Sequence, residues 1–292
     1  PRSWPQEKSD MVRIVSDSAC DMSPIEAVQK GVRLVPLKTL IDGVEYLDGV
    51  TISSEEFYEK LDNCKKLPST SQIAPAEFEE VFQEYAAQGD QVLAICLSGK
   101  LSGTAQSAFI AAESFPGKVW VVDSQNVTIA QCILVEYAVR LRNKGMDAPA
   151  IAAELERVKD KVCLVARVDT LEYLMRGGRL SRTAAVAGTV LNIKPVVGIE
   201  GGELKVLGKA RGSKQSSNML TELIDKKGGI DFSMPFMLAY SGLDDALLKG
   251  YIENSRALWE GHVKDLPVST IGSTIGTHAG PGAIAVAFFA KG

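Results

Sequence analysis

Two segments of the sequence combine hydroxyl side chains with glycine or proline in a way that suits the binding of an anion. Residues 98–104 have the sequence SGKLSGT and follow the apolar run VLAICL, and residues 68–72 have the sequence PSTSQ ahead of a predicted helix. Backbone N–H groups and the positive end of the helix dipole are exposed where a helix begins. Together the two segments predict a site that is rich in hydrogen-bond donors and orients a carboxyl group.

The segment at residues 98–104 resembles a nucleotide-binding P-loop only in outline. That motif requires GxxxxGK followed by serine or threonine, but Lys100 is followed by leucine and no glycine lies five residues before Gly99. Nucleotide binding is therefore not expected. A purely structural alternative remains open, in which Ser102 caps the helix and residues 68–72 form a turn and a cap.

Side chains that commonly catalyse reactions are scarce. The chain has two histidines, His262 and His278, no GxSxG nucleophile elbow, and five cysteines that are far apart and form no CxxC pair. Neither a metal cluster nor a disulfide framework is expected from this spacing. The sequence therefore favours a binding protein without a cofactor. The alternative is a serine-dependent hydrolase or transferase that acts on a small anionic substrate, with Ser102 as nucleophile and His278 as base.

A third segment, residues 176–182, places arginines around a double glycine. Its sequence is RGGRLSR, and a small, apolar stretch follows it. In one interpretation the double glycine ends a helix and the small residues beyond it pack closely. In the other, Arg176, Arg179 and Arg182 form a cationic rim beside an apolar cavity. A long apolar ligand with an anionic head requires that combination.

The composition is typical of a soluble globular protein. With 46% hydrophobic residues, 23% charged residues and a formal net charge of −4, the chain gives no reason to expect nucleic acid as a partner. No apolar run reaches the roughly 18 residues that span a bilayer, and the odd number of scattered cysteines favours a reducing cytoplasm. Residues 1–10 are polar, lack a hydrophobic signal core and are expected to form a flexible extension.

Short β-branched runs alternate with helical patterns from residue 12 onward, which is typical of βα units around a largely parallel sheet. We expect an α/β fold of two domains, at residues 11–161 and 162–292. The first has a largely parallel, Rossmann-like sheet. The second has a mixed sheet with helices and a β-hairpin that turns at Gly201 and Gly202.

In an open α/β sheet, the loops at the carboxyl ends of the strands converge on the ligand site. Residues 16–21, 68–72 and 98–104 are therefore expected to meet in one crevice. Further expected elements are one extended segment at residues 32–41, one helix at 244–259 and a strand around 268–275.

Seven segments in order resemble the DegV family of bacterial fatty-acid-binding proteins, which are the acyl-carrying subunits of fatty acid kinase. They lie within residues 12–291 and have the sequences VSDSACDMS, LPSTSQ, LSGKLSGTAQSA, VDSQN, LEYLMRGGRLS, LNIKPVVGIEGGEL and IGTHAGPGAIAV. The resemblance implies two α/β domains and one fatty acid buried between or along them, with its carboxylate held by hydroxyl groups.

The resemblance also implies eight ligand-binding residues by position. Those of the hydroxyl segments are Thr70 and Ser102, which contact the carboxylate, with Ser71 and Thr104 beside them. Those toward the head-group opening are Arg176 and His278, and those close by are Asp17 and Ser18.

A protein of this family is implied to be a carrier and not an enzyme. It buries a long-chain, palmitate-like fatty acid and presents the carboxylate to a separate kinase subunit, which performs the phosphoryl transfer. The expected partners are therefore the fatty acid and the catalytic subunit of a fatty acid kinase. Transient contact with a membrane is compatible with this role, and no nucleic acid is involved.

Overall fold

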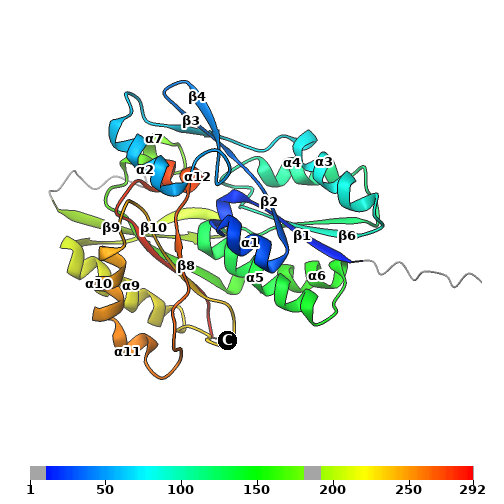
Figure 1. Cartoon of the computed structure of the whole chain (residues 1–292). Helices are drawn as coiled ribbons and strands as arrows, with labels where there is room; N and C mark the ends of the chain where they lie inside the picture. Colours follow the sequence, from blue (N-terminus) through cyan, green and yellow to red (C-terminus); the bar gives the residue numbers. More distant parts are fainter. Residues whose placement is uncertain (1–10, 181–191, 292) are drawn as a thin grey trace, which may run out of the picture.

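The chain is an α/β structure with two main sheets, helices on their faces and a small third sheet beside them (Figure 1). The structure is a computed structural model that describes residues 11–180 and 192–291. Residues 1–10, expected to form a flexible extension, lie outside the described residues, as does Arg182. Within the described ranges, no helix combines the length and the apolar character that crossing a bilayer requires.

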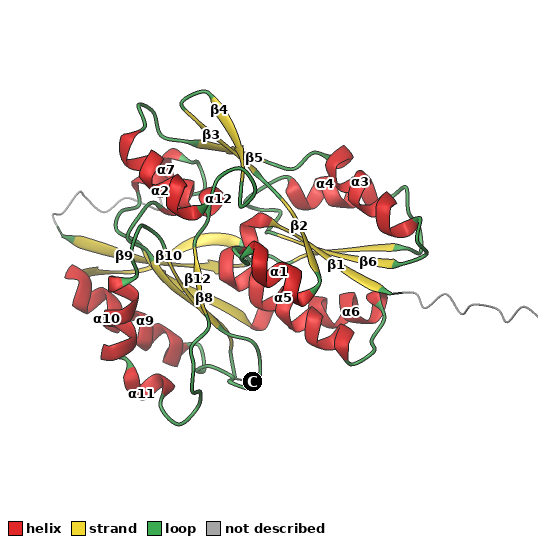
Figure 2. Cartoon of the chain, in the orientation of Figure 1, coloured by secondary structure: helices red, strands yellow, loops and turns green. Residues whose placement is uncertain are grey.

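The first main sheet is parallel, as the alternation of strands and helices predicts. Its strand order is β2-β1-β6-β7, and the strands are β1 (Val12–Asp17), β2 (Val32–Val35), β6 (Gln91–Cys96) and β7 (Val119–Asp123). Helices α3 (Pro75–Ala86) and α4 (Thr104–Ala112) cover one face, and α5 (Thr128–Asn143) and α6 (Ala148–Val158) cover the other, with α1 (Pro24–Lys30) beside β2 (Figure 2).

The second main sheet is mixed, with the strand order β10-β9-β8-β13-β11-β12. Its strands are β8 (Val162–Arg167), β9 (Ile193–Glu200), β10 (Glu203–Arg211), β11 (Met237–Tyr240), β12 (Val268–Thr270) and β13 (Ile284–Phe289). The β9–β10 hairpin turns at Gly201 and Gly202, as predicted. One face carries α9 (Gly212–Lys226) and α10 (Ala246–Asn254), and α11 (Arg256–Trp259) follows α10.

Helix α5 lies between the two main sheets. It packs against β1 and β6 on one side and against β8, β11 and β13 on the other. The consecutive residues Thr128–Val135 are all buried, because a helix with a sheet on each side has no face left for water. The two sheets therefore share one continuous hydrophobic core along this helix.

The third sheet is antiparallel and connects the two halves of the chain. Its strand order is β4-β3-β5, and the strands are β3 (Lys38–Ile41), β4 (Val44–Leu47) and β5 (Ser69–Ser71). Helix α12 (Ser273–Ala279), which comes late in the chain, packs against this sheet and against the helices α2 (Ser54–Asn63) and α7 (Glu172–Arg176). The late helix α12 is thus held by α2, β3 and β5 of the first half as well as by α7 of its own half.

Four expected elements differ from the structure. The extended segment 32–41 is divided at Pro36 into β2 and β3, which belong to different sheets. Residues 244–259 form two helices rather than one, and residues 268–275 form the short strand β12 followed by the start of α12. The segment 68–72 contains strand β5 rather than a turn, because its backbone pairs with the free edge of β3.

Candidate ligand-binding site

A cavity lies between α12, the loops of the parallel sheet and the inner face of the mixed sheet. The empty space that it encloses, with the open mouth included, is about 870 Å³. Most of its wall is aliphatic, with contributions from Leu37, Leu97, Leu101, Val127, Leu164, Ala166, Val168, Leu174, Val197, Leu204, Ile271, Ile275, Ala279, Ala283 and Ala285. Both halves of the chain therefore build one apolar space.

Small side chains on the inner face of the mixed sheet leave room for this space. Along a strand, successive side chains point to opposite faces. Ala166 of β8 and Ala285 of β13 face the cavity, whereas their neighbours Val165 and Val286 pack on the other face in a second core with residues of α9 and α10. The alternation AIAVA at residues 283–287 is the sequence pattern that could have indicated this small, cavity-facing side of the strand.

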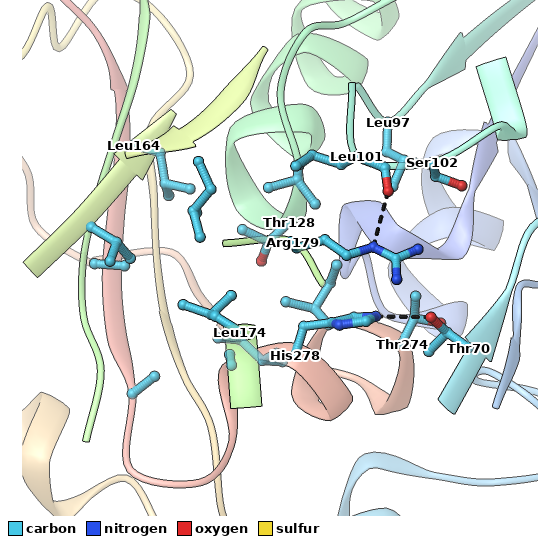
Figure 3. Close-up of a pocket in the computed structure, with 18 of the residues that line it drawn as sticks. Thr70, Leu97, Leu101, Ser102, Thr128, Leu164, Leu174, Arg179, Thr274 and His278 are labelled. Atoms are coloured by element: carbon cyan, nitrogen blue, oxygen red, sulfur yellow. Dashed lines mark hydrogen bonds between the residues drawn. The ribbon is translucent and has the colours of Figure 1, made fainter. Parts of the chain in front are cut away.

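Polar side chains gather at one end of the cavity. Figure 3 shows Thr70, Ser102, Arg179 and His278 on the same side, opposite Leu164. These polar residues come from four separate parts of the chain: β5, the loop before α4, the turn after α7, and α12. The segments at 68–72 and 98–104 therefore meet here, and the cavity has a polar end and an apolar body.

His278 and Thr70 form a hydrogen-bonded pair, with 2.8 Å between His278 Nε2 and Thr70 Oγ1. Burial, with a smaller contribution from the positive charge of Arg179, lowers the pKa of His278 to about 4. The imidazole is therefore neutral at pH 7. Its buried Nδ1 has no hydrogen-bond partner among the described residues.

The unpartnered Nδ1 determines how the pair shares its protons. A proton on Nδ1 would bury an N–H group without an acceptor, and an unsatisfied buried donor is costly. We therefore assign the proton to Nε2, which donates to Thr70 Oγ1. The hydroxyl of Thr70 then keeps its own proton as a donor for a ligand.

The turn after α7 decides which arginine reaches the cavity. Arg176 was expected at the head-group opening, but the structure places it on the exposed surface of α7, 2.6 Å from Glu172 in an ion pair. Gly178 then turns the chain with a φ of +74°, a conformation that favours glycine. Arg179 enters the cavity wall, where Nε donates to the Leu101 carbonyl at 3.1 Å.

Gly177 permits the close approach of this turn to the histidine. A Cβ atom at this position would lie 2.2 Å from Nδ1 of His278. Any other residue would therefore displace the imidazole. The double glycine both ends the helix, as one interpretation of the sequence proposed, and helps to build the polar end of the cavity.

Ser102 lies one residue before the N-cap of α4, which is Gly103. Its Oγ is 2.9 Å from Oγ1 of Thr104 and accepts the Thr104 N–H at 3.2 Å. Thr104 is fully buried and does not line the cavity, so it supports Ser102 from behind. Ser71 lines the cavity beside Thr70.

Asp17 and Ser18 lie beneath the cavity wall. Asp17 accepts the N–H of Leu97 at 2.8 Å, and the Ser18 hydroxyl accepts the N–H of Leu37 at 3.0 Å. Burial raises the pKa of Asp17 to about 6, although hydrogen bonds from Leu97 and other groups oppose the rise. Because Leu37 and Leu97 both line the cavity, the two polar residues position its wall.

The arrangement suits binding better than nucleophilic catalysis. A hydrolase with Ser102 as nucleophile needs a base within hydrogen-bonding distance of that hydroxyl. Here Ser102 is paired with Thr104 and His278 with Thr70. Within residues 11–180 and 192–291, no group of three or more histidine, cysteine, aspartate or glutamate residues could hold a metal ion.

The fold and the site define a class of α/β protein that encloses an apolar cavity between two sheets. The chain belongs to the DegV family. A sequence model of this family, described as "Uncharacterised protein, DegV family", matches residues 11–291. A DegV domain-containing protein from Deinococcus radiodurans is 36% identical over 281 residues, which cover 94% of this chain and 97% of the relative.

Two solved structures of other proteins share this architecture. A DegV family protein from Thermus thermophilus, described by its fatty acid binding, superposes with a TM-score of 0.85 at 33% identity and covers 96% of this chain and 99% of its own. A stearic acid-binding protein from Eubacterium ventriosum superposes with a TM-score of 0.84 at 26% identity, with coverages of 95% and 97%.

Proposed function

We propose that the protein binds one long-chain fatty acid in this cavity, with the carboxylate at the polar end and the acyl chain in the aliphatic part. The observation that carries the proposal is the division of a single cavity into these two parts. A fatty acid is divided in the same way. The descriptions of the Thermus and Eubacterium relatives as fatty-acid-binding proteins support the proposal.

The polar end provides one positive charge and several neutral donors. Because His278 is neutral at pH 7, Arg179 is the charged group among the described lining residues. The Thr70 hydroxyl, directed by His278, and the Ser102 hydroxyl supply neutral hydrogen bonds. Hydrogen bonds to a charged carboxylate are stronger than those between neutral groups, so this set orients the head group.

The aliphatic part supplies most of the affinity. Burial of an acyl chain contributes about 0.8 kcal/mol for each CH2 group removed from water. A chain of palmitate length therefore binds tightly without many polar contacts. In this division of roles the head group determines orientation, and the tail determines affinity.

We further propose that the protein is a carrier that presents the bound carboxylate to a separate fatty acid kinase subunit in the cytoplasm. The resemblance of the motifs to that family supports the role, and the absence of a P-loop from the sequence is consistent with phosphoryl transfer on another chain. The five cysteines are free thiols, which suits a reducing compartment.

Mass spectrometry of lipid extracted from the purified protein tests the binding proposal. We expect about one fatty acid per chain. A protein that carries no fatty acid and also fails to take up labelled palmitate would refute it. For the carrier role, the loaded protein is mixed with ATP and a fatty acid kinase subunit, and acyl phosphate is trapped with hydroxylamine. No hydroxamate from a loaded protein would refute that role alone.

A further inference from the structure

The two halves of the chain meet along two seams beside the cavity, and these seams are built very differently. The first seam is at the start of α12 and contains two buried carboxylates. The second is at the tip of the β9–β10 hairpin and contains fewer hydrogen bonds. A difference in the strength of two seams decides where a cavity opens, since local opening follows the weaker contacts.

The seam at α12 is densely hydrogen-bonded. The carboxylate of Asp21 accepts the N–H of Gly272 at 2.8 Å, and that of Asp48 accepts both the N–H and the hydroxyl of Ser273, at 3.0 and 2.9 Å. Further contacts are Thr39 with Ser273 at 3.0 Å and the Tyr58 hydroxyl with the Ile271 carbonyl at 2.9 Å. Opening this seam would break these five hydrogen bonds together, and each contributes on the order of 1 kcal/mol.

The seam at the hairpin tip is lightly bonded. The Ser98 hydroxyl, fully buried, donates to the Gly202 carbonyl at 2.6 Å, and Arg179 donates to the Leu101 carbonyl at 3.1 Å. Among the described residues these two bonds join the second half to the loop that carries Ser102. Both can be replaced by water when the seam parts, at little cost.

The hairpin is suited to movement. Strand β9 pairs with β8 over Val196–Gly198. The turn at Gly201 and Gly202 therefore extends beyond the part of β9 that is paired with β8. Strand β10 is the edge of the sheet. Leu204, two residues after the tip, and Leu101, three residues after Ser98, both line the cavity. Separation of the tip from the loop therefore uncovers the apolar wall.

We propose that the contact between Ser98 and Gly202 is a latch that controls passage of the ligand, with the seam at α12 as the fixed side. The proposal rests on the proposed function, because the ligand is taken to be a fatty acid. Ser98 is a positioning residue in this view. Its hydroxyl holds the hairpin tip against the head-group loop and does not touch the ligand.

A latch has a kinetic signature. It stabilises the closed form with and without ligand, so its removal raises the open population in both states. Association and dissociation rates then rise together, and the dissociation constant changes little. The loss of one net hydrogen bond corresponds to about a five-fold change. A residue that held the ligand itself would change the dissociation rate and the dissociation constant alike.

Exchange of cis-parinaric acid measures these rates. Dissociation is followed after a chase with excess oleate, and association by stopped flow on delipidated protein. Ser98→Ala removes the donor, and we expect both rates to rise about five-fold. Its control is Ser255→Ala, because the buried Ser255 hydroxyl donates to the Tyr251 carbonyl at 2.6 Å and neither residue lines the cavity. That variant should leave both rates unchanged.

A second pair of variants tests the latch from the hairpin. A Cβ atom at Gly202 would lie 2.7 Å from the Ser98 hydroxyl, whereas one at Gly201 would have no neighbour within 4 Å. Both glycines have a positive φ, +81° and +57°, so alanine strains the turn at either position. We expect Gly202→Ala to accelerate exchange and Gly201→Ala to leave it unchanged.

Three results would overturn the latch. They are unchanged rates in Ser98→Ala, equal acceleration by the control of either pair, and a dissociation constant that rises as much as the dissociation rate. If the wild-type protein binds no fatty acid, the proposed function fails. The latch is then tested separately by amide hydrogen exchange on the protein without ligand. In Ser98→Ala the amides of residues 199–204 should exchange faster while those of α12 do not; unchanged exchange at the tip would refute it.

Discussion

His278 Nε2 lies 2.8 Å from Thr70 Oγ1, although 208 positions separate the two residues in the chain. The bond joins α12, which comes late in the chain, to β5 of the small third sheet. It also determines the direction of a hydroxyl group, since the neutral imidazole donates and leaves the Thr70 proton for a ligand. A contact between the two halves of the chain thus prepares the polar end of the cavity.

The hydroxyl groups of Thr70 and Ser102 are expected to hold the carboxylate. The double variant Thr70→Val with Ser102→Ala should raise the dissociation constant for fatty acid roughly a hundred-fold or more, because it removes two hydrogen bonds to a charged group and each contributes about 1.5–3 kcal/mol. Fluorescence titration with cis-parinaric acid measures it. Ser69→Ala, an exposed neighbour on β5, is the control. Unchanged affinity in the double variant would mean that the head group lies elsewhere.

Arg179 and Arg176 are expected to differ in their importance for binding. Arg179→Gln should weaken fatty acid binding about ten-fold, because it removes the positive charge at the polar end. Arg176→Gln should have no effect, since its partner is Glu172 on the surface. The same titration compares them. If the Arg176 variant weakens binding and the Arg179 variant does not, the assignment of the head-group end is wrong.

His278 is expected to stay neutral over the physiological range. Its pKa of about 4 predicts that its imidazole ¹⁵N resonances do not change between pH 8 and pH 5. The chain has two histidines, so a His262→Gln variant is enough to assign the signals. A titration midpoint for His278 near the ordinary value of 6.5 would contradict the buried, neutral state.

The depressed pKa of His278 also predicts a dependence of stability on pH. The unfolded histidine takes up a proton near pH 6.5, whereas the folded one does so only near pH 4. The contribution of His278 to the free energy of unfolding therefore has its full value above pH 6.5. It decreases as the pH falls toward 4, by about 1.4 kcal/mol for each pKa unit. Urea unfolding measures the free energy of unfolding of the wild type and of His278→Gln. The wild-type value relative to the variant should decrease as the pH falls from 6.5 to 4. A constant difference would contradict the prediction.

The alanines on the inner face of β13 are expected to determine the space for the acyl chain. Ala285→Leu should shift the bound fatty acids toward shorter chains, because the larger side chain occupies part of the cavity. Mass spectrometry of the bound lipid and titrations with laurate and stearate measure the shift. Ala246→Leu adds the same group at an exposed site on α10. If Ala285→Leu weakens the binding of laurate and stearate equally, Ala285 does not select fatty acids by chain length.

Sequence patterns predicted the features that depend on neighbouring residues. The alternation of apolar runs and helical patterns identified the α/β fold, and the double glycine at 201 and 202 identified the hairpin. In both cases the physical cause is local, since strand and helix periods and positive φ angles are properties of a few adjacent residues. The segments at 68–72 and 98–104 were recognised for the same reason.

The tertiary structure alone decided which side chains share the cavity. Arg176 and Arg179 are equivalent in the sequence, and only the path of the chain after Gly178 separates them. The pairing of β5 with β3 and the position of α12 bring Thr70 to His278. These contacts depend on distant segments packing together, so they follow from the burial of the whole core and not from any local pattern.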